Sequence, residues 1–285
     1  MVRLKEQLID KLANVLDPDA LQLLPGRFQT IADIMVMNLK PQLLPYQEDI
    51  ANAILELLPF IKTVYLHKGG ITGQFREPSE MHYVAGEQKS TVRHVENRVI
   101  YEFDIEKIMY SKGNIEERRY LPKLVVPGET IVDMFAGIGY FSLPIAVHAR
   151  PACIYSIEIN PVAYEFLARN VELNNVGEIV HPILGNCADV VGDLAQQGVM
   201  ADRVIMGVFP APKEYLPQAL LVAKPEGGTI IHYEGVVERQ EVNPLLQDVI
   251  DACASAGRQV QLREHRIVKS YGPFKYHAVL DCEIL

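Results

Sequence analysis

From about Val125 onward, the sequence alternates short β-branched runs with amphipathic stretches of helical length. Strands are expected at Thr130–Phe135, Cys153–Ile159, Ile179–Leu184, Asp202–Phe209 and Thr229–Glu234. Helices are expected between them, at Tyr140–His148, Pro161–Asn174, Lys213–Ala223 and Pro244–Ala256. Strands that alternate with helices build βαβ units, whose parallel strands carry helices on both faces. The sequence therefore predicts an α/β fold with a mostly parallel sheet.

The end of the chain departs from this alternation. Two successive strands are predicted at Gln259–Val268 and Tyr276–Ile284, joined by a loop that contains Tyr271-Gly-Pro-Phe274. Strands that follow one another through a short loop pair as an antiparallel hairpin. We therefore expect an antiparallel C-terminal hairpin at one edge of the sheet.

The first hundred residues follow a less regular pattern. Apolar residues three and four apart predict helices at Leu4–Leu16 and Tyr46–Leu58. Strands are predicted at Thr63–His67, Met81–Ala85 and Thr91–Phe103, the last interrupted by a turn around Glu96-Asn97. This pattern predicts a smaller N-terminal α+β domain with antiparallel strands.

The chain of 285 residues has the length of about two domains. We expect an N-terminal α+β module at residues 1–105 and the α/β domain at residues 125–285. Residues 106–124 are expected to connect them, with Glu106–Leu121 as a connecting helix or a loop followed by a helix.

The net charge of −9, from 27 basic and 36 acidic residues, argues against a protein that coats nucleic acid by bulk charge. The acidic residues are unevenly distributed along the chain, since residues 125–285 carry 11 basic and 19 acidic side chains. Residues 62–123 carry 11 basic and 9 acidic side chains. A local basic surface in the first half of the chain therefore remains compatible with the acidic total.

Targeting and redox signals are weak in this sequence. The segment Met1–Asp10 mixes both charge signs and lacks the apolar core of a signal peptide, and no run of 18 apolar residues could span a membrane. The four cysteines are widely separated and form no Cys-x-x-Cys pair: Cys153, Cys187, Cys253 and Cys282. These features predict a cytoplasmic protein with reduced thiols, no membrane contact and no zinc or other metal.

A Gly-x-Gly turn follows the first strand of the α/β part, in the sequence Val132-Asp-Met-Phe-Ala-Gly-Ile-Gly-Tyr140. Glycines at a strand-to-helix turn let a ligand approach the backbone, since they present no side chain. Nineteen residues after Gly139, the second strand ends at Glu158. A carboxylate there can accept hydrogen bonds from both hydroxyls of a ribose, so the pair predicts a nucleoside site.

The dinucleotide fingerprint requires a third glycine where this chain has Ser142. Asp133 followed by Gly137 and Gly139 instead resembles the first motif of class I S-adenosylmethionine-dependent transferases, which have a Rossmann-like methyltransferase fold. The third strand ends in Gly185-Asn-Cys-Ala-Asp189, where those enzymes place residues that flank the adenine. The alternative is that the glycines are simple turn residues and Glu158 is a solvated strand end.

Two further segments resemble one family within that class: Ile108-Met-Tyr-Ser-Lys-Gly-Asn-Ile-Glu-Glu-Arg118 and Ala201-Asp-Arg-Val-Ile-Met-Gly-Val-Phe-Pro-Ala-Pro212. The family comprises tRNA guanine-N1 methyltransferases that act next to the anticodon and the related wybutosine-synthesising aminocarboxypropyltransferases. The methyltransferase branch typically has Asn-Leu-Pro where this chain has Gly207-Val-Phe-Pro210. The chain is therefore more similar to the archaeal aminocarboxypropyltransferase branch.

The resemblance implies a set of donor-binding residues. Ser111 and Arg118 would contact the amino-acid end of S-adenosylmethionine, and a guanidinium can pair with a carboxylate through two hydrogen bonds. Glu158 would bind the ribose, and Gly207 would make room for the amino-acid chain. Asn186 and Cys187 would flank the adenine, although a small buried residue is an equal interpretation of Cys187. The donor-binding set also includes Asp133, Gly137 and Gly139 of the first motif.

A general base is harder to assign. Glu117 matches the position of the base in the methyltransferase relatives, but the charged run Glu-Glu-Arg-Arg is equally typical of a solvated surface. His232 and His277 lie in apolar strands, where hydrogen-bonded core histidines are the expected outcome.

The implied acceptor is 4-demethylwyosine at position 37 of tRNA(Phe), which must leave the anticodon-loop stack to enter a pocket. The residues expected to contact the tRNA are Lys68, Arg76, Arg93, Lys112 and Arg119, with Lys62, Lys89, Arg98 and Lys123 as further members. No obligate protein partner is inferred. The alternative functions are guanine-N1 methylation of the tRNA at position 37 and a non-catalytic tRNA- or protein-binding module.

Overall fold

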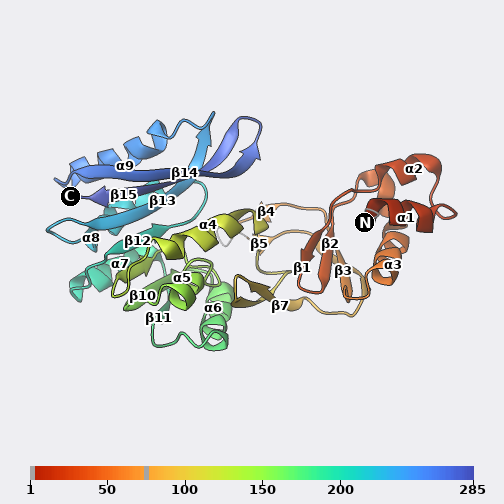
Figure 1. The fold of residues 1–285 in the computed structure, drawn as a ribbon, viewed down its shortest axis with the longest axis horizontal. Helices are drawn as coiled ribbons and strands as arrows, with labels where there is room; N and C mark the ends of the chain where they lie inside the picture. Colours follow the sequence, from red (N-terminus) through yellow and green to blue (C-terminus); the bar gives the residue numbers. More distant parts are fainter. Residues whose placement is uncertain (1–3, 74–76) are drawn as a thin grey trace. The chain divides into compact units, whose positions relative to one another are not determined.

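A computed structural model describes residues 4–73 and 77–285, which form two compact units (Figure 1). The first unit runs to Val95 and also includes Tyr101–Tyr110. The second unit comprises Glu96–Ile100 and Ser111–Leu285. The hairpin of β7 (Thr91–Glu96) and β8 (Val99–Asp104) thus contributes its turn to the second unit.

The first unit contains a four-stranded sheet in the order β1-β2-β3-β6. Its strands are β1 (Gln29–Ile31), β2 (Ile34–Met37), β3 (Thr63–His67) and β6 (Met81–Gly86). The predicted antiparallel pairing is confirmed for β3 and β6, but the sheet also contains a parallel pair, β2 and β3, which the sequence did not predict. A parallel pair needs a long crossover connection, which the 3-10 helix η1 (Pro41–Tyr46) and α3 (Gln47–Leu57) provide.

The N-terminal helices are α1 (Leu4–Leu12), α2 (Pro18–Leu23) and α3. Leu8 and Leu12 on α1, and Ile50 and Ile54 on α3, are buried at four-residue spacing. Side chains four apart lie on one face of a helix, so these residues pack into the core of the first unit. The helices predicted from this spacing are confirmed, with shorter bounds. Two short strands, β4 (Ile71–Thr72) and β5 (Glu77–Pro78), pair with each other.

The second unit contains a seven-stranded sheet in the order β11-β10-β9-β12-β13-β15-β14. The first five strands in this order are parallel: β11 (Val180–Leu184), β10 (Cys153–Glu158), β9 (Thr130–Asp133), β12 (Arg203–Met206) and β13 (Thr229–Glu238). The last two, β15 (Lys275–Ile284) and β14 (Val260–Gly272), form the predicted antiparallel hairpin at the edge. The predicted α/β fold with a smaller N-terminal α+β domain is confirmed.

Helices separate the parallel strands, as βαβ units require: α5 (Ser142–His148), α6 (Pro161–Leu173), α7 (Cys187–Gln196) and α8 (Leu216–Leu221). A further helix, α9 (Asn243–Ser255), lies between β13 and the C-terminal hairpin. A short 3-10 helix, η4 (Lys213–Tyr215), precedes α8. The sequence did not predict α7. One core cluster packs apolar residues of α7, α8 and α9 against the sheet. The glycines of the predicted motifs follow the carboxyl ends of two neighbouring strands, Gly137 and Gly139 after β9 and Gly207 after β12.

The segment predicted to connect the two domains has the loop-helix form of the two alternatives. Its helix is α4 (Ile115–Tyr120), flanked by the 3-10 helices η2 (Lys112–Asn114) and η3 (Leu121–Lys123), and all three belong to the second unit. Gly113 lies in η2, and glycine disfavours a continuous helix.

Within residues 4–73 and 77–285, no helix combines the length and apolarity needed to cross a membrane. The same residues contain no group of three or more His, Cys, Asp and Glu side chains arranged to hold a metal ion. All four cysteines are free thiols.

Candidate functional site

The turn after β9 requires its two glycines. Gly137 and Gly139 have φ of +56° and +96°, a backbone region that disfavours residues with a side chain. A Cβ atom at Gly137 would lie 2.6 Å from the Tyr140 ring, and one at Gly139 would lie 2.6 Å from Leu143. The turn thus passes close to its own side chains, and these glycines are structurally required.

Glu158 lies at the end of β10, beside this turn. Its Oε2 accepts a hydrogen bond from the Gly137 N–H at 2.7 Å, and its Oε1 accepts one from the Asn160 N–H at 2.8 Å. Burial raises the pKa of Glu158 above its ordinary value, although these backbone bonds oppose the rise. A carboxylate offers about four lone-pair positions, so the side chain retains acceptors for the hydroxyls of a ribose. The solvated strand end considered from the sequence is wrong, because Glu158 is partly buried and held in place.

Asp133 at the end of β9 is fully buried. Its Oδ2 accepts from the Ser142 hydroxyl at 2.7 Å, and the Ser156 hydroxyl donates to Ser142 at 2.7 Å. Burial raises the pKa of Asp133 to about 6. Ser142, which replaces the third glycine of a dinucleotide fingerprint, therefore stabilises the carboxylate under the turn.

The residues predicted to flank an adenine begin α7. Asn186 is its N-cap, and its Oδ1 accepts from the Ala188 N–H at 3.0 Å. Cys187 is buried in the core of the second unit, and burial raises the pKa of its thiol to about 12. The Cys187 side chain therefore packs as a small apolar residue, so only its backbone could lie beside an adenine.

Gly207 follows β12 and lies against two side chains of the second unit. A Cβ atom at this position would lie 2.5 Å from Cε2 of Phe141 and 3.6 Å from Cδ of Glu234. The space beside Gly207, which the sequence assigned to the amino-acid chain of the donor, is filled by the Phe141 ring in this structure.

Arg118 is buried on α4 and pairs with Glu96. Its Nε and Nη2 donate to the two carboxylate oxygens of Glu96 at 2.7 and 2.6 Å, and its Nη1 donates to the Ser111 carbonyl at 3.1 Å. The Arg118 side chain is 3% exposed and that of Glu96 is 4% exposed. The guanidinium edge predicted to bind the donor's carboxylate is therefore bound to a carboxylate of the chain itself.

Lys269 on β14 lies beside Ser111, and sequence reasoning missed it. Its Nζ donates to the Ser111 hydroxyl at 3.3 Å. A Cβ at Gly113 would lie 2.3 Å from Lys269 Nζ, so glycine leaves the space that this side chain occupies. Among the described residues, no carboxylate lies within 4.0 Å of Lys269, and burial lowers its pKa. A half-buried cation beside Ser111 is suited to bind a carboxylate ligand.

Glu117 is buried beside a group of charged residues on the three C-terminal strands. Its Oε1 accepts from Arg266 Nη2 at 2.8 Å, and His232 Nε2 lies 3.3 Å from the same oxygen. The solvated surface considered for Glu117 is wrong, because the residue is 3% exposed.

The two predicted core histidines complete this group. His232 Nδ1 lies 2.7 Å from Asp281 Oδ1, and His277 Nε2 lies 3.0 Å from Glu234 Oε2. Burial raises the pKa of Glu234, but its bonds with both histidines outweigh burial and lower it to about 2. Polar residues two apart on an apolar strand, such as His232 and Glu234, share one face, and this pattern could have indicated the cluster.

The predicted tRNA-binding residues occupy different environments. Lys68 is exposed, whereas Arg93 Nε donates to Glu102 at 2.6 Å. Arg76 and the side chain of Lys112 lie outside the described residues. Arg119 is exposed on α4 and lines a cavity together with Arg98 and Lys123.

Comparisons with known proteins match both halves of the chain. The TRM5/TYW2 methyltransferase domain matches residues 91–261, and the TYW2 N-terminal domain matches residues 8–89. The tRNA(Phe) (4-demethylwyosine(37)-C(7)) aminocarboxypropyltransferase of Pyrococcus horikoshii is 36% identical over 99% of this chain and 97% of its own length.

A methyltransferase is also similar. The tRNA (guanine(37)-N(1))-methyltransferase Trm5b of Pyrococcus abyssi is 30% identical over 92% of this chain and 76% of its own length. Among solved structures, P. horikoshii TYW2 in complex with MeSAdo superposes with a TM-score of 0.82, at 31% identity over 99% of both chains.

Proposed function

Because the chain belongs to the TRM5/TYW2 family of tRNA-modifying transferases, we propose that it transfers the 3-amino-3-carboxypropyl group of S-adenosylmethionine to 4-demethylwyosine at position 37 of tRNA(Phe). The observation that carries this proposal is the likeness to the P. horikoshii aminocarboxypropyltransferase over 99% of the chain. The match of residues 8–89 to the TYW2 N-terminal domain supports the same branch of the family.

The geometry of the second unit fits the nucleoside part of the donor. Glu158 retains acceptors for a ribose and is fixed by the Gly137 and Asn160 backbone. Gly137 and Gly139 keep the turn free of side chains, while Asn186 and Cys187 would contribute backbone beside the adenine. Asp133 would stabilise the glycine turn indirectly, because it accepts a hydrogen bond from the Ser142 hydroxyl.

For the amino-acid end of the donor we assign Ser111 and Lys269. Their side chains are 3.3 Å apart, and Lys269 offers a cation that no described carboxylate neutralises at close range. Arg118 would position this segment, because its guanidinium binds the Ser111 carbonyl while it is paired with Glu96. Gly207 is not assigned a contact with the donor, because the Phe141 ring fills the space beside it.

The donor supplies an electrophilic carbon bonded to a sulfonium, and the electron pair of that bond leaves with methylthioadenosine. The acceptor base forms the new carbon–carbon bond and loses a proton from the same ring carbon. We assign acceptance of this proton to Glu117, which Arg266 holds through two hydrogen bonds at 2.8 and 3.3 Å.

Product analysis tests the proposal. The protein is incubated with S-adenosylmethionine and tRNA(Phe) that carries 4-demethylwyosine, and both products are identified by mass spectrometry. Methylthioadenosine with an aminocarboxypropylated base is expected. S-adenosylhomocysteine with a methylated base would overturn the assignment of the transferred group.

The second candidate is guanine-N1 methylation, favoured by the 30% identity to P. abyssi Trm5b. A parallel reaction with an unmodified tRNA transcript that carries guanosine at position 37 separates the two functions. We expect no product from this transcript, whereas N1-methylguanosine would support the second candidate.

A further inference from the structure

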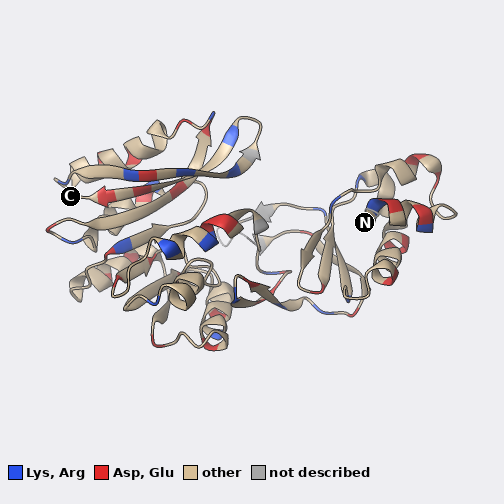
Figure 2. Ribbon diagram, viewed as in Figure 1, with Lys and Arg blue, Asp and Glu red and all other residues tan. Residues whose placement is uncertain are grey.

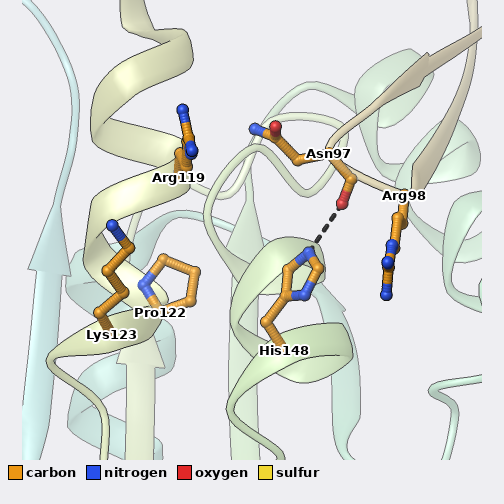
Figure 3. Close-up of a pocket in the computed structure, with 6 residues that line it drawn as sticks. All are labelled: Asn97, Arg98, Arg119, Pro122, Lys123 and His148. Atoms are coloured by element: carbon orange, nitrogen blue, oxygen red, sulfur yellow. Dashed lines mark hydrogen bonds between the residues drawn. The ribbon is translucent and has the colours of Figure 1, made fainter.

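The second unit has a basic cavity of about 400 Å³. Three segments line it: the turn between β7 and β8, the α4–η3 segment and the last residue of α5 (Figure 3). Its lining residues are Asn97, Arg98, Arg119, Pro122, Lys123 and His148. Three of these six carry a full positive charge and none carries a negative one, so the lining is suited to an anion.

The three cations are not neutralised by the surrounding chain. Among residues 4–73 and 77–285, no carboxylate oxygen lies within 4.0 Å of the charged ends of Arg98, Arg119 or Lys123. All three residues are exposed. Figure 2 shows that α4 carries both acidic and basic residues. Of these, Glu117 and Arg118 are buried. Arg119, the next residue, remains at the surface.

The turn that carries Arg98 is held in place from three directions within the second unit. Glu96, before the turn, forms the buried pair with Arg118. The carbonyl of Asn97 accepts from His148 Nε2 at 2.7 Å, which Figure 3 shows as a dashed line. Beyond the turn, Ile100 exchanges two hydrogen bonds with the Asn174 side chain, at 2.8 and 2.7 Å. Arg98 is therefore presented by a rigid backbone.

The conformation of Arg98 is an independent observation. Asn97 and Arg98 have φ of +49° and +67°, so both central residues of this two-residue turn are left-handed. Such turns favour glycine at the second position, because a Cβ is disfavoured there. The chain nevertheless has an arginine at this position. Backbone strain at a residue that supplies charge to a cavity indicates a functional role.

We propose that this cavity binds a phosphodiester group of the tRNA backbone. The inference rests on the proposed function only in taking tRNA as the partner. Planar guanidinium groups match phosphate oxygens through paired hydrogen bonds, and Lys123 adds a point charge. Among the described residues, no Phe or Tyr side chain lines the cavity to stack on a base, so it is suited to the backbone and would position the tRNA without reading its sequence. Such a site also offsets the net negative charge of residues 125–285, which repels RNA.

Salt-dependent binding tests the proposal. The affinity of a fluorescein-labelled tRNA(Phe) transcript is measured by anisotropy over a range of KCl concentrations, for the wild type and three variants: Arg98→Gly, Arg119→Gln and Lys123→Gln. Each variant is expected to weaken binding about threefold to tenfold and to reduce the log–log salt slope by about 0.7 to 0.9. Arg98→Gly should also raise the melting temperature, because glycine relieves the left-handed strain.

Lys275→Gln is the matched control, since Lys275 is an exposed cation of the second unit outside the cavity. It should leave the salt slope unchanged. Unchanged slopes in all three cavity variants would overturn the proposal. This test is independent of the product analysis that tests the proposed function. If the slopes were reduced but the product were unexpected, the assignment of the transferred group would be rejected and the phosphate site would be retained.

A separate arm distinguishes tRNA phosphate from free phosphate. Inorganic phosphate is titrated into the wild type and into a variant that combines the three cavity substitutions, while the melting temperature is recorded. Weak stabilisation of the wild type alone, with reduced tRNA slopes in the variants, supports the proposal. Stabilisation by phosphate with unchanged tRNA slopes would assign the cavity to a free anion and overturn it.

Discussion

His232 and Asp281 lie directly opposite each other on the antiparallel strands β13 and β15, and their side chains meet in the buried interior. Asp281 Oδ1 is 2.7 Å from His232 Nδ1, and Asp281 Oδ2 accepts from Arg266 Nη1 at 2.7 Å. Asp281 therefore links the histidine to the arginine that holds Glu117. The cross-strand register brings together groups that are far apart in the sequence.

The first prediction concerns the stability of this cluster with pH. Burial lowers the pKa of His232, but the bond with Asp281 and the nearby carboxylates of Glu234 and Glu117 outweigh burial and raise it to about 9. Because this value exceeds the unfolded value of 6.5, the stabilisation is complete below about pH 6.5 and is lost as pH rises through about 9. The free energy of unfolding should fall by at most about 3 kcal/mol over this interval.

Urea unfolding of the wild type and His232→Gln between pH 6 and 9.5 checks this expectation. The variant should be less stable at pH 6, and its stability should change less with pH. His265→Gln, at an exposed position on β14, should retain the wild-type dependence. Identical pH profiles for the wild type and His232→Gln would show that His232 does not bind its extra proton in the folded state.

The second prediction concerns Glu117 as the general base. Glu117→Gln keeps the shape of the side chain but removes its capacity to accept a proton, so kcat should fall by about 10² to 10⁴. The affinities for tRNA and S-adenosylmethionine should change little. Glu116→Gln is the matched control, because Glu116 is the exposed neighbour on α4.

Turnover, binding and thermal unfolding are measured on the same preparations. Unchanged turnover in Glu117→Gln would show that the base lies elsewhere. A structural role alone would lower the melting temperature without altering the pH dependence of kcat, whereas a general base predicts that the acidic limb of that dependence disappears.

The third prediction concerns Lys269 and the amino-acid end of the donor. A charge-assisted hydrogen bond contributes about 1.5 to 3 kcal/mol, so Lys269→Met should weaken S-adenosylmethionine binding about tenfold to a hundredfold. Methylthioadenosine lacks the amino-acid end and should bind both proteins equally. Calorimetry with both ligands measures the difference, and Lys275→Met is the control. Equal weakening of both ligands would place Lys269 away from the amino-acid end.

The alternation of apolar runs and helical stretches was sufficient to predict the α/β sheet, because burial on both faces of parallel strands requires those runs. It did not reveal α7, which begins directly after the turn at Asn186. In the N-terminal unit, the parallel pairing of β2 with β3 was missed because Ile34–Met37 is only four residues long. Short strands have too few residues for a clear period.

The site was predictable where its residues follow one another along the chain. Gly137, Gly139 and Glu158 lie in motifs with fixed spacing. Glu96 and Lys269 were not predicted, because their roles depend on long-range contacts with Arg118 and Ser111. Pairings of this kind depend on tertiary packing, which local patterns do not encode.

The fourth prediction concerns the contact between Gly207 and Phe141. A Cβ at Gly207 would lie 2.5 Å from the Phe141 ring, so Gly207→Ala should overpack this region and reduce stability by about 1 to 3 kcal/mol. Phe141→Leu removes the ring atoms that approach Gly207, and the double variant should recover part of the stability lost in Gly207→Ala. Urea unfolding of the four proteins gives the coupling energy between the two positions. Additive losses would show that the Phe141 ring does not determine the need for glycine at position 207.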